Sequence, residues 1–204
     1  MTNAAEHLAF QCRCGAIAGE LRVPGPGHGD HFVCYCNDCR DFARLLERDD
    51  TLDAAGGSSV YQTRVGNLRI ERGLNDLACL NLTGGQTLRW YCESCQTPLF
   101  NTMANGRWPF LSMITASTDP DQRRAMLGQP RGSVFAQYAT GPDVVTPPVS
   151  TFALVRRVVK RLLADKFSGA AKGYQLFDTE TKNPIAKPRM IEKQERERLH
   201  QGDA

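Results

Sequence analysis

Apolar and polar positions alternate over short segments between residues 8 and 146, a pattern typical of half-buried β-strands. Turn-forming sequences rich in glycine and proline separate these segments, among them PGPGHGD, AAGGSS and TGGQ. The pattern therefore predicts a mainly β domain over residues 8–146. The segments predicted as strands are FQCRCGAIAGELRV, DHFVCYC, SSVYQTRV, NLRIERG, DLACLNL, QTLRWYC and PLFNTM.

Two short helices are predicted within this domain. Apolar residues recur at helical spacing in DCRDFARLLERDD, at Phe42, Leu45 and Leu46, which indicates a helical turn or two after Cys39. The segment DPDQRRAMLGQP has an acidic start and ends on Gly-Gln-Pro, so it is predicted to form a short helix as well.

A longer amphipathic helix is predicted after Pro147 and Pro148, which mark the start of a helical, basic C-terminal extension over residues 147–204. We expect its apolar side to pack on the domain and its basic side to face water. Contact with a membrane surface or a partner is the alternative. The apolar side carries Phe152, Val155, Val158, Val159, Leu162 and Leu163, and the other side mostly carries Arg156, Arg157, Lys160 and Arg161.

Charge is unevenly divided along the 204 residues. Residues 151–204 hold 12 basic and 7 acidic side chains, whereas the remainder holds 13 basic and 15 acidic ones. The cysteine-bearing part is thus weakly acidic, which disfavours nucleic-acid binding. No apolar run reaches the roughly 18 residues that span a bilayer, and the N-terminus lacks the pattern of a secretory signal. We expect a cytoplasmic protein whose thiols stay reduced.

Eight cysteines are present, and seven of them lie in pairs or a triplet at the spacing of metal ligands. This clustering favours zinc over redox chemistry, because the cytosol disfavours disulfides. The eighth, Cys79, lies in the alternating apolar segment LACLNL and is predicted to be a small buried apolar residue.

Four of these cysteines predict a closed structural zinc site. Cys12 and Cys14 face the same side of a strand, whereas Cys92 and Cys95 form a Cys-x-x-Cys knuckle where a strand enters a turn. Together they supply the four thiolates of a tetrahedral site, which would join an early strand to a late one and stabilise the fold. The main alternative pairs the knuckle with the two cysteines of the segment CYC.

The remaining three, Cys34, Cys36 and Cys39, predict a second zinc site with an open fourth position. Catalytic zinc sites take three protein ligands and leave a position for water or substrate, such as a thiol bound as thiolate. Arg40 is close enough in sequence to offset the negative charge of three thiolates. Two zinc ions per chain are therefore expected.

A closed and inert second site is the alternative. It requires a fourth side chain near the triplet, and His31, three residues before Cys34, is the best candidate. Asp38, Asp41 and His28 are the other candidates.

The order of motifs CRCGAIAGEL, CYCNDCR and GLNDLACLNLTGGQTLRWYCESCQTPLFNT resembles the glutathione-dependent formaldehyde-activating enzyme family, which includes the centromere protein V group. The resemblance covers Phe10 to Met103 and includes all seven clustered cysteines in order. It implies a β-tent, a set of small antiparallel sheets around zinc sites. Carried over by motif, Cys12, Cys14, Cys92 and Cys95 hold structural zinc, and Cys34, Cys36 and Cys39 hold catalytic zinc.

The activity that the resemblance implies is carbon–sulfur lyase chemistry on thiol–aldehyde adducts, of the S-(hydroxymethyl)glutathione synthase type. The implied partners are a small thiol such as glutathione and an aldehyde such as formaldehyde. The chain departs from the family at Gln96, where a glycine is usual, in the continuation RDFARLL after the triplet, and in the extension after Pro147. The alternatives are a non-catalytic zinc module that contacts a protein or nucleic acid, and a metal or thiol buffer.

Overall fold

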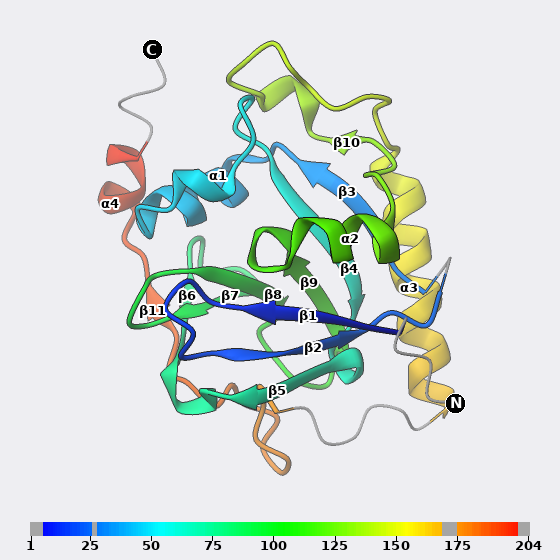
Figure 1. The fold of residues 1–204 in the computed structure, drawn as a ribbon. Helices are drawn as coiled ribbons and strands as arrows, with labels where there is room; N and C mark the ends of the chain where they lie inside the picture. The colour runs from blue at the N-terminus through cyan, green and yellow to red at the C-terminus, as the bar shows by residue number, and fades with distance from the viewer. Residues whose placement is uncertain (1–5, 26–27, 169–174, 200–204) are drawn as a thin grey trace.

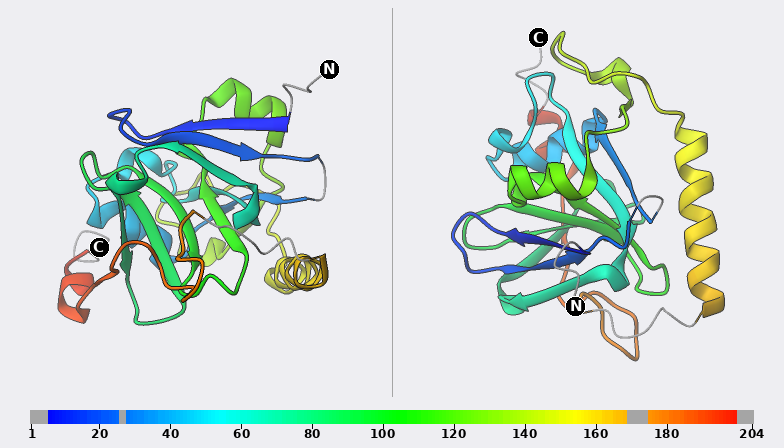
Figure 2. Two further views of the ribbon diagram at one scale, coloured as in Figure 1. Left: turned by 90° about the horizontal axis from the view of Figure 1, so that it is seen from below. Right: turned by 45° about the vertical axis from the view of Figure 1, so that its right-hand side comes forward.

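The computed structural model describes residues 6–25, 28–168 and 175–199, and its ribbon is drawn in Figure 1. The architecture is mainly β, which confirms the predicted class. An eight-stranded sheet has the order β10-β3-β4-β9-β8-β7-β6-β11, and a three-stranded sheet has the order β1-β2-β5. Strands β1, β2 and β5 lie in front of the large sheet in Figure 1 and above it in the left view of Figure 2.

All neighbouring pairs in the two sheets are antiparallel except at the edges of the large sheet, where the two-residue strands β10 and β11 pair parallel with β3 and β6. Strands of the small sheet are β1 His7–Gln11, β2 Ala18–Arg22 and β5 Leu68–Arg72. Strands of the large sheet are β3 Asp30–Cys34, β4 Ser58–Arg64, β6 Leu77–Asn81, β7 Thr87–Cys92, β8 Pro98–Met103, β9 Phe110–Ile114, β10 Ser133–Val134 and β11 Arg189–Met190.

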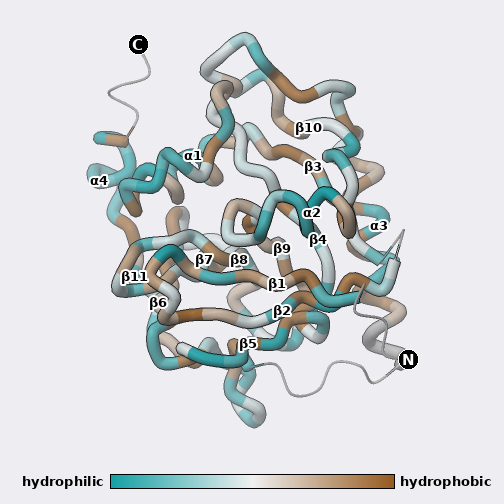
Figure 3. Tube along the Cα trace, in the orientation of Figure 1, coloured by the Kyte–Doolittle hydropathy of each residue, from teal (hydrophilic) through white to brown (hydrophobic). Residues whose placement is uncertain are grey.

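Four α-helices and five short 3₁₀ helices connect or cover the strands in the described part of the chain. Figure 3 shows hydrophobic segments along the strands, whereas α1 and α4 are mostly hydrophilic. The α-helices are α1 Asn37–Leu45, α2 Pro120–Leu127, α3 Thr151–Ser168 and α4 Lys193–Arg198, and the 3₁₀ helices are Asp49–Thr51, Val65–Asn67, Leu74–Asp76, Thr115–Ser117 and Ala136–Tyr138.

The main apolar core lies between the two sheets. Trp90 and Phe100 from the large sheet are fully buried there, and the ring of Phe10 from β1 meets Phe100 edge to face with centroids 5.3 Å apart. Within the small sheet, Gly19 lets β2 pair closely with β5. A Cβ atom at Gly19 would lie 2.1 Å from the carbonyl oxygen of Arg69, so no other residue fits without a backbone shift.

A second apolar cluster covers the opposite face of the large sheet. Phe32 and Cys34 of β3 point to this face, and α1 packs on it through Phe42 and Leu46. Residues that alternate along a strand point to opposite faces, so His31 and Val33 point away from this cluster. The helical prediction after Cys39 is confirmed, although the helix begins two residues earlier, at Asn37.

Helix α3 presents a mixed inner side, unlike the one expected from its sequence. Leu154 is buried and Val158 and Leu162 are half-buried, whereas Arg156 and Lys160 are exposed. Arg157 and Arg161 point inward and donate hydrogen bonds of 2.7 and 2.8 Å to the carboxylate of Asp30, which is only 1% exposed. The expectation of an inward apolar side and a solvated basic side is therefore wrong for Arg157 and Arg161 and for part of the apolar side, which is exposed. In Figure 2, right, α3 stands along one side of the molecule. The large apolar side chains that it exposes are Phe152, Val155, Val159 and Leu163.

The described residues of the C-terminal extension also take part in the sheet and the core. Strand β11 pairs with β6, and Leu176 and Phe177 are buried in the main core, where the Phe177 ring meets Trp90 edge to face. A domain boundary at Pro147 stays a prediction. None of the helices in residues 6–25, 28–168 and 175–199 is both long and apolar enough to cross a bilayer.

Candidate metal centres

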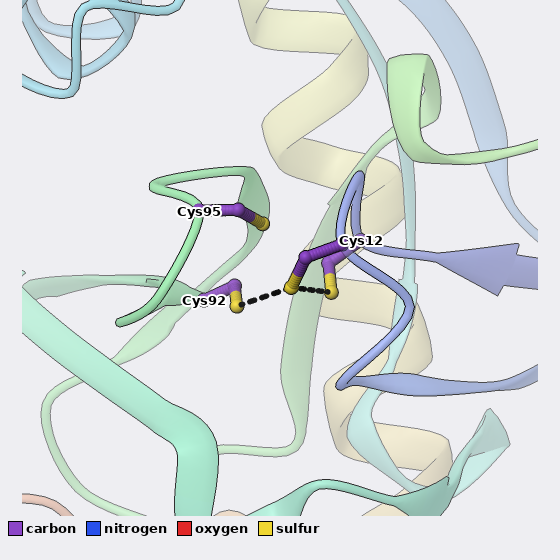
Figure 4. Close-up of side chains that lie close together, drawn as sticks. Cys12, Cys92 and Cys95 are labelled. Atoms are coloured by element: carbon purple, nitrogen blue, oxygen red, sulfur yellow. Dashed lines mark hydrogen bonds between the residues drawn. The ribbon is translucent and has the colours of Figure 1, made fainter.

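The loop between β1 and β2 and the turn after β7 bring Cys12, Cys14, Cys92 and Cys95 together, a group that we call the four-cysteine cluster. Figure 4 shows the labelled side chains of Cys12, Cys92 and Cys95 converging from these two segments. The Sγ atoms of Cys12 and Cys14 are 3.5 Å apart, and those of Cys14 and Cys92 are 3.8 Å apart. The alternative pairing of the knuckle with Cys34 and Cys36 is wrong.

This spacing fits one tetrahedral ion. Four sulfurs at about 2.3 Å from a zinc ion lie about 3.8 Å from one another. The backbone amide of Ile17 donates to the Sγ of Cys12 over 3.2 Å. The four-cysteine cluster can therefore hold a metal ion with every coordination position filled by the protein.

Thr97 is a supporting residue that sequence reasoning missed. Its hydroxyl lies 3.1 Å from the Sγ of Cys95 and accepts hydrogen bonds from the backbone amide of Arg13 and the guanidinium of Arg48. Burial opposes ionisation of Cys95, but the hydrogen bonds from Thr97 and from backbone amides outweigh it and lower the pKa of that thiol to about 6. Thr97 follows the knuckle by two residues, which was the available signal.

Gln96, the position at which the family resemblance has a glycine, adopts a left-handed conformation with φ of 56°. Such a conformation costs a residue with a Cβ atom roughly 1–2 kcal/mol more than glycine. The knuckle of this chain thus keeps the backbone shape that favours glycine while carrying a larger side chain.

The second group, which we call the three-cysteine cluster, consists of Cys34, Cys36 and Cys39. Cys34 ends β3, Cys36 is the N-cap of α1, and Cys39 lies in the first turn of that helix. The Sγ atoms of Cys34 and Cys36 are 3.3 Å apart. The N-terminus of a helix favours negative charge. At Cys36 the hydrogen bond with Cys34 lowers the pKa, but the hydrogen bond with Cys39, burial and the Cys39 charge outweigh it and raise the pKa to about 12.

Arg89 is a cation beside this cluster that the sequence did not indicate. Hydrogen bonds from Cys34 and Cys36 hold the pKa of the Cys39 thiol well below its ordinary range, and the nearby Arg89 guanidinium lowers it further. Arg40 donates to the carbonyl of Tyr138 and to the side chain of Asn37. Arg89 comes from β7 and is buried, so nothing local in the sequence links it to the triplet.

A polar row crosses the large sheet beneath the three-cysteine cluster. Gln62 of β4 pairs with Ser112 of β9, which pairs with Asn101 of β8, which pairs with Arg89 of β7. Directly paired residues share a face of the sheet, so these four side chains are neighbours. Together with Cys34 and Cys39 they line a cleft of about 150 Å³. None of these four residues is predicted from the sequence.

The candidates for a fourth ligand are all engaged elsewhere or lie outside the group. His31 makes hydrogen bonds of 3.0 Å with the carbonyl of Gly128 and 3.1 Å with the hydroxyl of Ser59, on the opposite face of β3 from Cys34. His28 is exposed. Among the described residues no histidine, cysteine or carboxylate joins the three thiols at ligand distance.

The two carboxylates of α1 bind a residue of the C-terminal extension. Arg196 of α4 donates to Asp38 and, over 2.7 Å, to Asp41, which is fully buried. Asp38 also lies 3.5 Å from the guanidinium of Arg89. These ion pairs place α4 against α1, as Figure 1 shows, and direct the carboxylates away from metal binding.

Cys79 lies apart from both clusters, as predicted. It is 2% exposed, and its thiol donates to the carbonyl of Ala186 over 3.3 Å. Burial raises the pKa of this thiol to about 12, so it stays protonated and takes no part in metal binding.

The fold and the two thiol clusters define a mainly β protein with two groups of cysteines that can each hold a metal ion. A family model described as a family of unknown function, DUF6151, matches residues 5–185, and the chain belongs to this family. No curated protein matches the chain.

Three chains of solved structures match. One is the crystal structure of a protein from Rhodobacter sphaeroides, which is 19% identical over 60% of this chain and 97% of that one, with a TM-score of 0.41. That similarity is too weak to transfer any property to this chain.

Proposed function

We propose that this protein is a zinc-dependent enzyme of the carbon–sulfur lyase type that acts on adducts of a thiol and an aldehyde. The observation that carries the proposal is a cluster of three thiols, with no fourth protein ligand in the described residues, at the edge of a cleft with a polar floor. The motif order that resembles the glutathione-dependent formaldehyde-activating family supports the same chemistry. The four-cysteine cluster would hold the structural zinc of this arrangement.

The reaction requires neither an oxidant nor a reductant. In the synthetic direction the S–H bond of a thiol breaks, a C–S bond forms to the aldehyde carbon, and the proton ends on the former carbonyl oxygen as a hydroxyl. The reverse direction releases thiol and aldehyde. Zinc, when bound, would supply a Lewis acid that favours the thiolate or polarises the carbonyl.

The residues around the cleft match the demands of that chemistry. Cys34, Cys36 and Cys39 would hold the ion, and the N-terminus of α1 and the buried Arg89 would offset the negative charge of the thiolates. Gln62 and Ser112 offer hydrogen-bonding groups to the hydroxyl of an adduct inside the cleft. Holding thiol and aldehyde together at this floor would accelerate an otherwise bimolecular step.

Exchange NMR spectroscopy of glutathione and formaldehyde, with and without zinc-loaded protein, tests the proposal. We expect faster exchange with the wild-type protein and the spontaneous rate with Cys36→Ser. Cys79→Ser is the matched control, because it removes a buried thiol outside both clusters, and it should retain the acceleration. The proposed activity would be excluded if the wild-type protein left the exchange at its spontaneous rate, both for glutathione with formaldehyde and for apolar thiols with aldehydes.

A further inference from the structure

A second, mostly apolar cleft of about 230 Å³ lies between α3 and the large sheet. Its walls are formed by β3, β9 and β10, by Phe135 directly after β10, and by the inner side of α3. Its lining is more strongly apolar than that of the cleft at Arg89, which is also mainly apolar but carries the row of Gln62, Ser112, Asn101 and Arg89. The apolar side chains that matter most are Phe32, Phe110, Val134, Phe135, Leu154 and Val158.

The two clefts adjoin at the three-cysteine cluster. They share four lining residues, namely Phe32, Cys34, Gln62 and Phe110. Cys34 therefore borders both the polar floor and the apolar cleft. A molecule that reacts beside Cys34 has an apolar space next to its reacting end.

Gln62 marks the junction with an unsatisfied polar atom. Its Oε1 atom is buried and has no hydrogen-bond partner, although the residue borders both clefts. A buried acceptor without a partner destabilises a fold by about 1–3 kcal/mol, and native proteins rarely keep one without a reason. A hydroxyl donor bound beside Cys34 would satisfy it.

We propose that the apolar cleft binds the apolar substituent of the substrate, so that the protein acts on adducts in which the thiol or the aldehyde carries a short aliphatic chain or an aromatic ring. This inference rests on the proposed function and narrows its substrate class. The hydroxyl of the adduct donates to Gln62 while its apolar group lies against Phe32 and Leu154. In the part of the chain that the structure describes, no cationic side chain lines the apolar cleft, which disfavours an anionic peptide such as glutathione there.

Binding of straight-chain primary alcohols from ethanol to octanol, measured by calorimetry on the zinc-loaded full chain, tests this directly. These probes carry the hydroxyl and the apolar chain without the reacting groups. We expect the affinity to rise about fourfold with each added methylene until the cleft is full. Affinity that does not change with chain length overturns the inference.

Two valines of α3 provide a matched pair of variants. Val155 is 54% exposed and lines the cleft, whereas Val159 is 46% exposed on the same helix and does not line it. Val155→Trp should fill the mouth of the cleft and weaken octanol binding at least tenfold, and Val159→Trp should leave it unchanged. Equal effects of the two substitutions contradict the proposed location.

The role of Gln62 is tested by comparing 1-hexanol with methyl pentyl ether, which has the same length but no hydroxyl donor. Wild type should prefer the alcohol about two- to tenfold, and Gln62→Leu should lose this preference. An unchanged preference in the variant removes Gln62 from the inference.

The outcomes separate this inference from the proposed function. Chain-length-dependent alcohol binding without acceleration of any adduct reaction would retain the cleft as a binding site but reject the enzyme. Acceleration of the glutathione reaction without alcohol binding would retain the enzyme and reject the apolar substrate class.

Discussion

Replacing Asp30 with asparagine removes the carboxylate that holds α3 against the large sheet. Arg157 and Arg161 of α3 approach it to 2.7 and 2.8 Å, and Arg131 approaches it to 3.6 Å. Asparagine keeps the size of the side chain, so the substitution changes charge and hydrogen bonding without leaving a cavity. We expect Asp30→Asn to loosen α3 and with it one wall of the apolar cleft.

The magnitude follows from how deeply each partner is buried. The side chains of Arg131 and Arg157 are 50% and 40% exposed, so their pairs contribute little, at most about 1 kcal/mol each. The Arg161 side chain is only 11% exposed, and Asp30 is buried as well. Removing one partner of a buried pair leaves an uncompensated charge and costs about 3–5 kcal/mol. We therefore expect a loss of about 3 kcal/mol in the free energy of unfolding.

The pH dependence gives an independent check. Burial alone would raise the pKa of Asp30, but the hydrogen bonds and charges of Arg161 and Arg157 lower it below its ordinary value of 3.8. Because the folded-state pKa is depressed, the stabilisation is present above pH 3.8 and is lost as the pH falls through the folded-state value. The stability difference between wild type and Asp30→Asn should therefore shrink below pH 3.8 and stay constant above it.

Urea unfolding of the zinc-loaded chain at pH 7 and at a series of acidic pH values measures both effects. Glu71→Gln is the control, because the Glu71 side chain is 51% exposed and lies 4.0 Å from Arg69, so its loss should cost less than about 1 kcal/mol. A cost below about 1 kcal/mol for Asp30→Asn at pH 7 would refute the reasoning, since it would mean that Asp30 does not hold α3.

Three further predictions concern the clusters and the core. Thr97→Val should weaken metal retention by the four-cysteine cluster about 10- to 100-fold in competition with a chelator, because Cys95 loses its hydroxyl donor; unchanged retention would contradict that role. Arg89→Met should weaken metal retention by the three-cysteine cluster and leave the four-cysteine cluster unaffected, and an equal effect on both would argue against a local charge effect. Trp90→Phe should lower the free energy of unfolding in urea by about 1–3 kcal/mol, because the buried hydroxyl of Thr102 loses the indole donor that lies 2.8 Å away. An unchanged free energy of unfolding would show that this hydrogen bond contributes nothing to stability.

Much of the fold could be predicted because the alternation of apolar residues matches the strands. Each of the seven segments predicted as strands contains at least one strand of the structure. Strand β9 was missed, although FLSMI lies at the centre of the large sheet between β4 and β8. A central strand is covered on both faces, so its residues are nearly all apolar and no alternation marks it.

The orientation of α3 could not be predicted from its own sequence. Helical periodicity separates an apolar side from a basic side, but it does not say which of the two faces the protein. Which side of α3 faces the protein depends on Asp30, which lies 127 residues before Arg157 and is buried at the start of β3. The buried carboxylate attracts Arg157 and Arg161 inward, so these arginines share the inner side of α3 with Leu154 and Val158, and the other large apolar side chains of the helix are partly or largely exposed.

The grouping of the cysteines was predictable, and the surroundings of the groups were not. The spacing within each motif is local and indicates which thiols can share an ion. The expectation that Cys12 and Cys14 lie on one side of a strand is wrong, because β1 ends at Gln11 and both cysteines lie in the loop before β2. The polar row of Gln62, Ser112, Asn101 and Arg89 arises only from the register of four strands. One residue of slip in any pair would turn part of the row to the other face, so the sequence alone does not reveal it.

The central claim is that seven thiols form two separate metal sites, one closed and one open. Zinc analysis of the purified chain combined with X-ray absorption at the zinc edge tests it most directly. The variants Cys36→Ser and Cys92→Ser each remove one thiol, from the three-cysteine cluster and from the four-cysteine cluster respectively. We predict two zinc ions per chain, an average of about 3.5 sulfur neighbours per ion at about 2.3 Å, and a lighter atom in the remaining position. One zinc ion per chain, or four sulfurs around every ion, would contradict it.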